Sequence, residues 1–177
     1  CGASSFLLPT LPGDEYPPLP DLPQAVGSVD AGVFAAAVAQ VAVASASPDE
    51  RNHAYAGIRM EIEPDGRLTL AATDRYRLAV RELPWEPLAA DQPIAVTIPG
   101  REFLEATKAF ADAGTVTVHL GEAETSLSLT AGSRQTGLRL MDSANFPKFR
   151  SLLPTQFVSQ PEIEVGALKE ALKRVSL

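Results

Sequence analysis

The feature that most constrains the fold of this chain is a repeated order of elements. An extended segment, an amphipathic helix and three alternating strands follow one another twice within residues 24–153, and residues 160–177 begin a third copy. Half-buried strands need a cover on one face, and two helices lying side by side can supply it. The repeat therefore predicts an α+β domain with two antiparallel sheets, two packed helices and a pseudo-twofold axis.

Apolar residues spaced three and four apart predict the helices. We expect the first helix over Val33–Ala46, with Asp30 as its N-cap. Pro99 lies near the start of the second helix, where its missing N–H costs little. The apolar positions are Val33, Phe34, Val38 and Val41 in the first helix, Phe103, Leu104, Thr107 and Phe110 in the second, and Leu168, Leu172 and Val175 in the third.

Strands are predicted where apolar and polar residues alternate. Pro64-Asp65-Gly66 is typical of a hairpin turn between two of them. On the strand Thr115–Leu120, His119 lies on the face opposite Val116 and Val118, so we expect it to face solvent. The alternating sets are Ile58, Met60 and Ile62; Leu68, Leu70 and Ala72; Tyr76, Leu78 and Val80; Val116, Val118 and Leu120; Leu127 and Leu129; and Thr136, Leu138 and Leu140.

Two segments are expected to link these elements. Leu8–Pro23 is rich in proline, which lacks the N–H that a helix or an inner strand needs, so it is predicted to be an extended linker. Ser5–Leu8, just before it, has a strand-like pattern, and Glu82–Pro93 is expected to join the two copies. The domain boundaries we expect are 1–23 for the end of a preceding domain and its linker, 24–153 for a complete domain, and 154–177 for a linker and the start of another domain.

The two ends of the sequence suggest a piece of a longer protein. It has no initiator Met, and Val165–Leu177 has the pattern of a helix without a cap at its end. The single cysteine, Cys1, allows no disulfide within the chain, which fits a cytoplasmic protein. No apolar run reaches the roughly 18 to 20 residues that a membrane span needs.

The charge balance limits which partners the chain can bind. The net charge of −7 excludes a protein that coats nucleic acid with its whole surface. A local basic face remains compatible with it, because charges are screened beyond about 8 Å at physiological salt. Eleven of the fifteen cationic residues are Arg, a bias typical of a GC-rich genome.

The sequence offers little support for catalysis. His53 and His119 are the only histidines, and neither has a partner at metal-ligand spacing. A phosphate-binding glycine loop and a nucleophile elbow are both absent. Asp74 could serve as an acid or a base, but an Asx turn between two strands is the better interpretation. We therefore expect no catalytic residue, no metal and no cofactor.

Two short runs carry the most specific signal, namely Leu70–Glu82, which includes Ala72-Thr73-Asp74-Arg75-Tyr76-Arg77-Leu78, and Phe146–Pro154, Phe-Pro-Lys-Phe-Arg-Ser-Leu-Leu-Pro. Together they resemble the middle domain, with flanking segments, of the bacterial sliding clamp, the beta subunit of DNA polymerase III, in an actinobacterial-like form. The resemblance implies three such domains per chain and two chains closing head to tail into a ring around duplex DNA. It also implies a non-catalytic processivity factor that holds the replicative polymerase and the clamp loader through short peptides.

The resemblance further assigns residues to two surfaces. A peptide-binding cleft would have its floor at Tyr55, one wall at Thr73, Arg75, Tyr76, Arg77 and Leu78, and the other at Pro147, Ser151 and Leu152. The DNA-facing residues would be Arg51, His53, Arg101, Lys108, Lys169 and Lys173. Arg101 and Lys108 are seven residues apart and so share a helix face.

Two positions depart from the pattern of the clamp family. Tyr55 stands where most relatives have a Leu, and Ser151 stands where some have an Arg. Both changes fit a specialised second copy of the clamp, for example one that escapes an antibiotic directed at the clamp. A different alternative is a fragment of an unrelated α+β enzyme whose active site lies outside this piece.

Overall fold

The computed structural model describes residues 7–10, 12–13, 21–48, 53–88, 92–121 and 125–176, without the side chain of His53. The chain divides into two compact units, Cys1–Phe146 and Pro147–Leu177. The elements of the first unit are β1 (Gln24–Asp30), α1 (Ala31–Ala42), the 3₁₀ helix η2 (His53–Ala56), β2 (Gly57–Glu63), β3 (Arg67–Thr73), β4 (Leu78–Pro84), β5 (Glu86–Pro87), β6 (Ile94–Pro99), α2 (Gly100–Lys108), β7 (Thr115–Leu120), β8 (Ser126–Ala131) and β9 (Arg134–Arg139). The second unit contains the 3₁₀ helix η4 (Phe149–Leu152) and α3 (Val165–Val175).

The predicted order of elements is confirmed, and so is the α+β class with two antiparallel sheets and two packed helices. One sheet has the order β4-β3-β2-β6, and the other has the order β5-β1-β7-β8-β9. Each sheet therefore contains the last three strands of one copy of the repeat together with the first strand of the other copy. β6 pairs with β2 of the preceding copy, and β1 pairs with β7 of the following copy.

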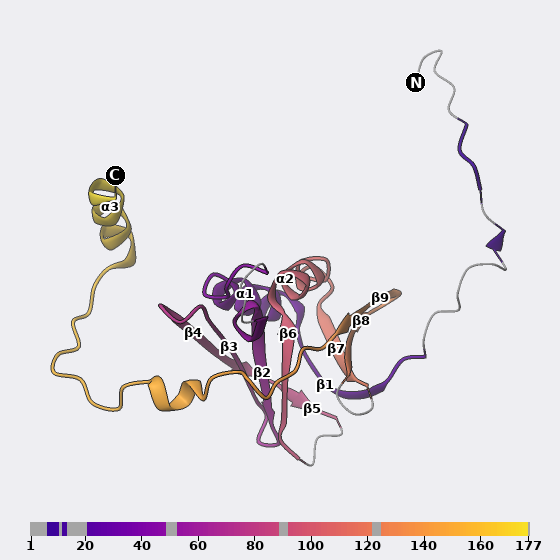
Figure 1. Ribbon diagram of the computed structural model, residues 1–177, viewed down its shortest axis with the longest axis horizontal. Helices are drawn as coiled ribbons and strands as arrows, with labels where there is room; N and C mark the ends of the chain where they lie inside the picture. The colour runs from indigo at the N-terminus through magenta and orange to yellow at the C-terminus, as the bar shows by residue number, and fades with distance from the viewer. Residues whose placement is uncertain are drawn as a thin grey trace. The chain divides into compact units, whose positions relative to one another are not determined.

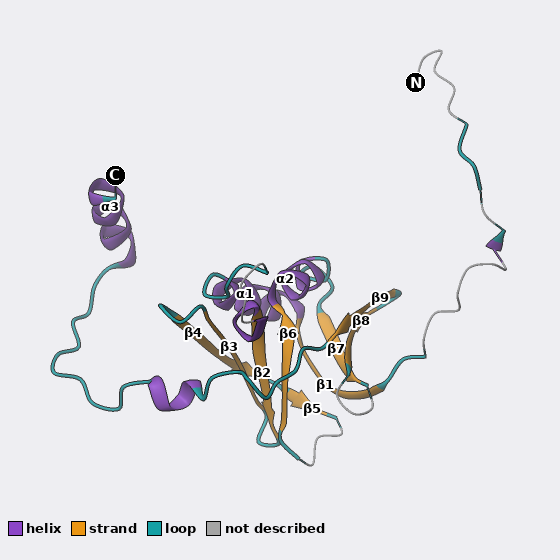
Figure 2. Ribbon diagram, in the orientation of Figure 1, coloured by secondary structure: helices purple, strands orange, loops and turns teal. Residues whose placement is uncertain are grey.

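The two long helices of the first unit lie side by side and cover both sheets (Figure 1). All the strands lie on the other side of this helix layer (Figure 2). Phe34 of α1 and Phe103 of α2 meet edge to face, with ring centroids 5.6 Å apart and ring planes at 72°. Aromatic pairs favour this geometry because the positive edge of one ring meets the negative face of the other.

The core lies between the helix pair and the inner faces of the sheets. Its largest fully buried side chains come from both helices and both sheets, and they include Phe34, Phe103, Ile58, Met60, Ile62, Leu68, Leu70, Leu127 and Leu129. Burying one such side chain stabilises a fold by about 1.5–3 kcal/mol. Because neither copy of the repeat has a complete sheet of its own, the two copies must fold together.

The first helix differs from its prediction at both ends. It runs from Ala31 to Ala42, and the Oδ1 of the predicted cap Asp30 accepts the N–H of Val33 at 2.8 Å. Beyond Ala42 the chain turns, because the N–H of Ala44 bonds to the carbonyl of Val41. Val33, expected on the buried face, is 42% exposed. The apolar pattern alone therefore extended this helix too far.

The segment expected to link the two copies contains strand residues of both sheets. β4 continues to Pro84, and β5 then pairs Glu86 with Ser28 and Pro87 with Gly27 of β1. The chain thus crosses from one sheet to the other at Trp85. The Trp85 side chain is 4% exposed and packs against Gly27 so closely that a Cβ there would lie 2.2 Å from the indole.

His119 is buried, so the prediction that it faces solvent is wrong. It is 9% exposed, and its Nδ1 lies 3.0 Å from the carbonyl oxygen of Pro23. Its Nε2 lies 3.0 Å from the Oγ1 of Thr130 on β8. The imidazole therefore joins the end of the proline-rich segment to the second sheet, a long-range contact that strand alternation could not indicate.

The predicted linker and the chain ends are described only in part. Leu7–Thr10 and Asp21–Pro23 contain no strand, while Ser5 and Phe6 of the strand-like run lie outside the described residues. α3 ends at Val175, and Glu164 caps its start by accepting the N–H groups of Gly166 and Ala167. Among the described helices, none is both long and apolar enough to cross a membrane.

We predict that residues 24–153 fold on their own, because both copies of the repeat lie within them. Trp85, the only tryptophan of the sequence, reports on the contact between the sheets. Thermal unfolding of this span, followed by tryptophan fluorescence and by circular dichroism, should give one cooperative transition at the same temperature.

A matched pair of glycine substitutions controls this experiment. Gly27→Val should lower the transition temperature, because its side chain would collide with Trp85 and with the carbonyl oxygen of Glu86. Gly137→Ala in β9 should change it less, since the nearest atom, Oγ of Ser128, is 3.8 Å from the new Cβ. A gradual transition of the unsubstituted span would contradict these boundaries.

Candidate functional site

The turn from Thr73 to Leu78, between β3 and β4, is held by its own polar side chains. Oγ1 of Thr73 donates to the carbonyl of Arg77 at 2.7 Å and accepts the N–H of Arg75 at 3.2 Å. Oδ1 of Asp74 accepts the N–H groups of Tyr76 and Arg77 at 3.1 and 3.0 Å. The Asx turn predicted for Asp74 is thus confirmed, and this carboxylate is part of the turn's structure.

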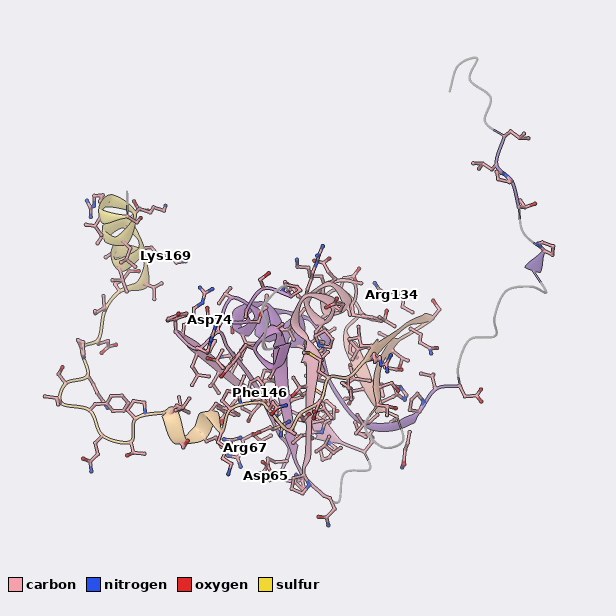
Figure 3. All side chains as sticks on the ribbon, in the orientation of Figure 1. Asp65, Arg67, Asp74, Arg134, Phe146 and Lys169 are labelled. Carbon is pink, nitrogen blue, oxygen red and sulfur yellow. The ribbon has the colours of Figure 1, made fainter. Side chains whose placement is uncertain are left out.

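The electrostatics of the turn follow from these hydrogen bonds. The pKa of Asp74 is lowered from its usual value, chiefly because its carboxylate accepts the backbone N–H of Arg77. Partial burial opposes this shift, and the N–H of Tyr76 and the guanidinium of Arg77 add to it. Nε of Arg77 lies 2.8 Å from Oδ2 of Asp74. Asp74 lies at one end of the β3–β4 hairpin, and Arg67 and Asp65 lie at the other (Figure 3).

Arg75 has an unusual backbone and a defined side-chain contact. Its φ is 82°, the one positive φ outside glycine in the part of the chain that the structure describes. A left-handed residue with a Cβ costs about 1–2 kcal/mol, so the hydrogen bonds around it must hold the turn. The Cζ of Arg75 lies 5.5 Å from the centroid of the Tyr55 ring, within the range of a cation–π contact.

The other wall residues of the first unit are arranged differently from their prediction. Tyr76 was expected in a strand with Leu78 and Val80, but it lies in the turn and its side chain is 92% exposed. Leu78 is the first residue of β4 and is half-buried. Tyr55 is half-buried in η2, and its carbonyl accepts the N–H of Ala46.

The residues predicted for the opposite wall belong to the second unit. Pro147 precedes η4, which contains Ser151 and Leu152. The hydroxyl of Ser151 donates to the carbonyl of Lys148 at 2.7 Å, so it is engaged within its own turn. The side chain of Leu152 is 63% exposed.

The residues predicted to face DNA are only partly described. Arg101 and Lys108 are exposed at the two ends of α2, and Nζ of Lys108 lies 3.5 Å from Oε1 of Glu105. Lys169 and Lys173 are exposed on α3, and Lys173 pairs with Glu170 at 3.0 Å. Arg51 and the side chain of His53 lie outside the described residues.

The charges on the two packed helices balance. α1 has no charged residue, and its exposed positions include Ala36, Ala39 and Gln40. α2 carries Arg101 and Lys108 against Glu102 and Glu105, a net charge of zero. This helix layer therefore offers little general attraction for phosphates.

An apolar groove of about 410 Å³ lies where the end of α1 meets the first turn of α2. Ala42, Pro48, Leu104 and Met141 are among its lining residues. Its charged lining residues are Arg101 and Glu102 of α2, alongside the helix start at Gly100. Across the described ranges no three His, Cys, Asp or Glu side chains gather to hold a metal ion.

The sequence pattern predicted the turn at Asp74 but not the contact between Arg75 and Tyr55. The alternation of Arg75, Tyr76 and Arg77 suggested a strand, whereas a positive φ at Arg75 breaks it. Glycine is the usual signal for such a position, and here an arginine occupies it. The Tyr55–Arg75 contact joins residues twenty positions apart, so no local pattern could reveal it.

Comparison with known proteins identifies the family of the chain. A family model described as the central domain of the DNA polymerase III beta subunit matches residues 28–148. The beta sliding clamp of Streptomyces coelicolor is 42% identical over all of this chain and 47% of its own length. The beta sliding clamp homolog GriR of Streptomyces muensis is 43% identical over the same shares of both chains. The chain thus spans about half the length of these relatives.

A solved structure shares the fold. The DNA polymerase III subunit beta sliding clamp of Pseudomonas aeruginosa, bound to griselimycin, superposes with a TM-score of 0.78 at 23% identity. The match covers 98% of this chain and 46% of that one. This similarity shows that the two proteins share a fold.

We predict that the pKa of Asp74 lies below the usual range for an aspartate side chain, chiefly because its carboxylate accepts the backbone N–H of Arg77. Because its folded pKa is lowered, its stabilisation of the turn is complete above the unfolded pKa and is lost as pH falls through the folded pKa. Arg77→Ala should raise the Asp74 pKa only part of the way, since both backbone N–H donors remain. The measurement is an NMR titration of the carboxyl carbon.

Arg81→Ala is the control for this titration, because Arg81 is exposed in β4 beyond the turn. It should leave the pKa of Asp74 unchanged. A return of the Asp74 pKa to the ordinary aspartate range in the Arg77→Ala protein would show that the side chain of Arg77, and not the backbone, causes the shift.

Proposed function

Because this chain belongs to the DNA polymerase III beta subunit family, the bacterial sliding clamps, we propose that it is the middle part of a ring around duplex DNA. In this role it holds the replicative polymerase and other partners near the template and so confers processivity. The protein is a tether and catalyses nothing itself. A partner held at millimolar local concentration rebinds before it diffuses away, which is why a tether raises processivity.

The observation that carries the proposal is the two-copy domain with α1 and α2 side by side over two sheets. A helix layer of this kind can face DNA, while the strands on its other side form the outside of a ring. A family match over residues 28–148 supports the same role and leaves the alternative of an unrelated enzyme without support.

The sliding clamp of Streptomyces coelicolor extends beyond the part that this chain matches, and we propose that most of the other two domains of the ring correspond to that remainder. We propose that residues 1–23 end the first domain, that 24–153 form the middle domain, and that 154–177 begin the third. Exposed apolar residues on α3, including Leu168 and Leu172, support the last assignment, since they need the rest of a domain to cover them. Two full-length chains would close the ring, and its place is the cytoplasm.

Contacts with DNA are proposed to be weak and few. Arg51, His53, Arg101, Lys108, Lys169 and Lys173 are the residues that would face the duplex. The balanced charge of α2 and the uncharged α1 support weak contacts. A ring holds DNA by topology, so tight phosphate contacts are unnecessary and would slow sliding.

We propose that partners bind as peptides in a cleft with its floor at Tyr55. One wall would comprise Thr73, Arg75, Tyr76, Arg77 and Leu78, and the other Pro147, Ser151 and Leu152. Support comes from Tyr76 and Leu152, whose large side chains are exposed to solvent. The polar turn at Asp74 supports it too, because a rigid wall lowers the entropy cost of binding.

We predict that Leu152→Ala and Arg77→Ala each weaken binding of a polymerase-tail peptide by about 1–3 kcal/mol, the range for anchor contacts. Leu152 would lose apolar area against the peptide, and Arg77 would lose a polar contact. Calorimetry with the full-length protein and a synthetic peptide from the C-terminal tail of the replicative polymerase of the same organism measures both effects.

Arg139→Ala serves as a matched control, because Arg139 is an exposed arginine at the end of β9. It should bind the peptide as the unsubstituted protein does. Unchanged affinity in both the Leu152→Ala and Arg77→Ala proteins, with their folds intact, would rule out this cleft.

A second candidate is a specialised clamp that tolerates a clamp-binding antibiotic. The similarity to GriR and to the Streptomyces coelicolor clamp is nearly equal, so identity does not distinguish the two roles. The observation that favours the specialised role is Tyr55, a bulky ring at the proposed floor that Arg75 covers.

We predict that Tyr55→Leu raises affinity for griselimycin, because a leucine leaves space that the phenol fills. A covered phenol hydroxyl without a partner would also cost roughly 1–3 kcal/mol, and leucine removes this cost. Parallel titration of the native and Tyr55→Leu proteins with griselimycin measures the difference in affinity. Equal or weaker binding by the variant would remove the case for a narrowed floor.

A further inference from the structure

Arg75 stands out because its backbone and its side chain are both constrained. Thr73 and Asp74 hold the turn through four hydrogen bonds, and within it Arg75 is forced to a φ of 82°. Residues with a Cβ rarely adopt a positive φ, so the turn imposes an uncommon backbone conformation on Arg75. The backbone conformation therefore sets the direction in which the side chain of Arg75 leaves the main chain.

The side chain runs from there to Tyr55. Its Cζ is 5.5 Å from the ring centroid, so the guanidinium covers one face of the phenol. Tyr55 in turn is fixed within η2, and its carbonyl bonds to the N–H of Ala46 after α1. The contact thus joins the turn between β3 and β4 to the segment that precedes β2.

We propose that Arg75 is a latch over Tyr55 that determines which ligands the cleft accepts. This inference rests on the proposed function of the Thr73–Leu78 wall. With the latch closed, a ligand that packs an apolar side chain on Tyr55 must first displace the guanidinium. The chain therefore discriminates against ligands with a large apolar anchor, and Arg75 is the specificity-determining residue.

Two substitutions separate the cation–π contact from the strain of the backbone. Arg75→Gln removes the cation but keeps a side chain at the positive φ. Arg75→Gly removes both, and glycine adopts this φ without cost, so the turn is retained. Arg81→Gln is the matched control, since Arg81 is an exposed arginine of the adjoining strand β4.

The binding experiment uses the full-length protein and calorimetry with the synthetic polymerase-tail peptide. Arg75→Gln and Arg75→Gly should each bind the peptide about two- to fivefold more tightly, the factor that an exposed cation–π contact represents. Arg81→Gln should bind it unchanged. In the Tyr55→Leu background, Arg75→Gln should cause no further gain in affinity, because the aromatic ring that Arg75 covers is already absent. Equal or weaker binding by Arg75→Gln, or independent effects of the two substitutions, would overturn the latch.

A measurement without ligand tests the contact itself. With ¹³C-labelled tyrosine, the Tyr55 ring resonances, assigned through Tyr55→Phe, should shift on Arg75→Gln and stay in place on Arg81→Gln. An unmoved Tyr55 signal in the Arg75→Gln protein would overturn the latch.

Failure of the latch differs from failure of the cleft. If Leu152→Ala weakens the peptide while the Arg75 variants leave it unchanged, the cleft stands and the latch is wrong. If Leu152→Ala and Arg77→Ala both bind normally, the cleft is wrong, and the latch as a determinant of its ligands is wrong with it.

Discussion

The exchange of first strands between the two copies of the repeat is the constraint on which the rest of this structure depends. β1 completes the sheet of the second copy, and β6 completes the sheet of the first. Each exchanged strand is followed by a helix, and the exchange brings these two helices side by side, so that Phe34 and Phe103 meet. The chain crosses from one sheet to the other at Trp85, and the side chain of Trp85 packs against Gly27. Neither copy can bury its apolar face alone, so the domain is a single cooperative core.

The β3–β4 hairpin, at the edge of one sheet, builds the candidate site. The ladder between β3 and β4 runs from Arg67 and Pro84 to Thr73 and Leu78, which fixes where the turn begins and ends. Thr73 and Asp74 then satisfy the backbone of the turn with their own oxygen atoms. A turn so held can tolerate the strain at Arg75, and strain of this kind persists only where the surroundings over-determine it.

The distribution of charge connects the fold with the proposed role. A net charge of −7 would be a poor basis for gripping nucleic acid, and the helix layer is neutral in both of its helices. A ring does not need such a grip, because release requires opening and not merely dissociation. Peptide binding, as proposed, would depend instead on local contacts, such as those that the exposed side chains of Tyr76 and Leu152 can make.

The sequence by itself determined the order of elements, the helix cap at Asp30, the turn at Asp74 and the resemblance to the clamp family. These follow from local spacing and local hydrogen bonds, which a linear pattern contains. Only the tertiary structure decided the strand exchange, the burial of His119, the strand β5 and the contact between Arg75 and Tyr55. Each of these joins residues far apart in the chain, and such pairs form because of packing and backbone pairing across the whole core. No periodicity of a single segment encodes them.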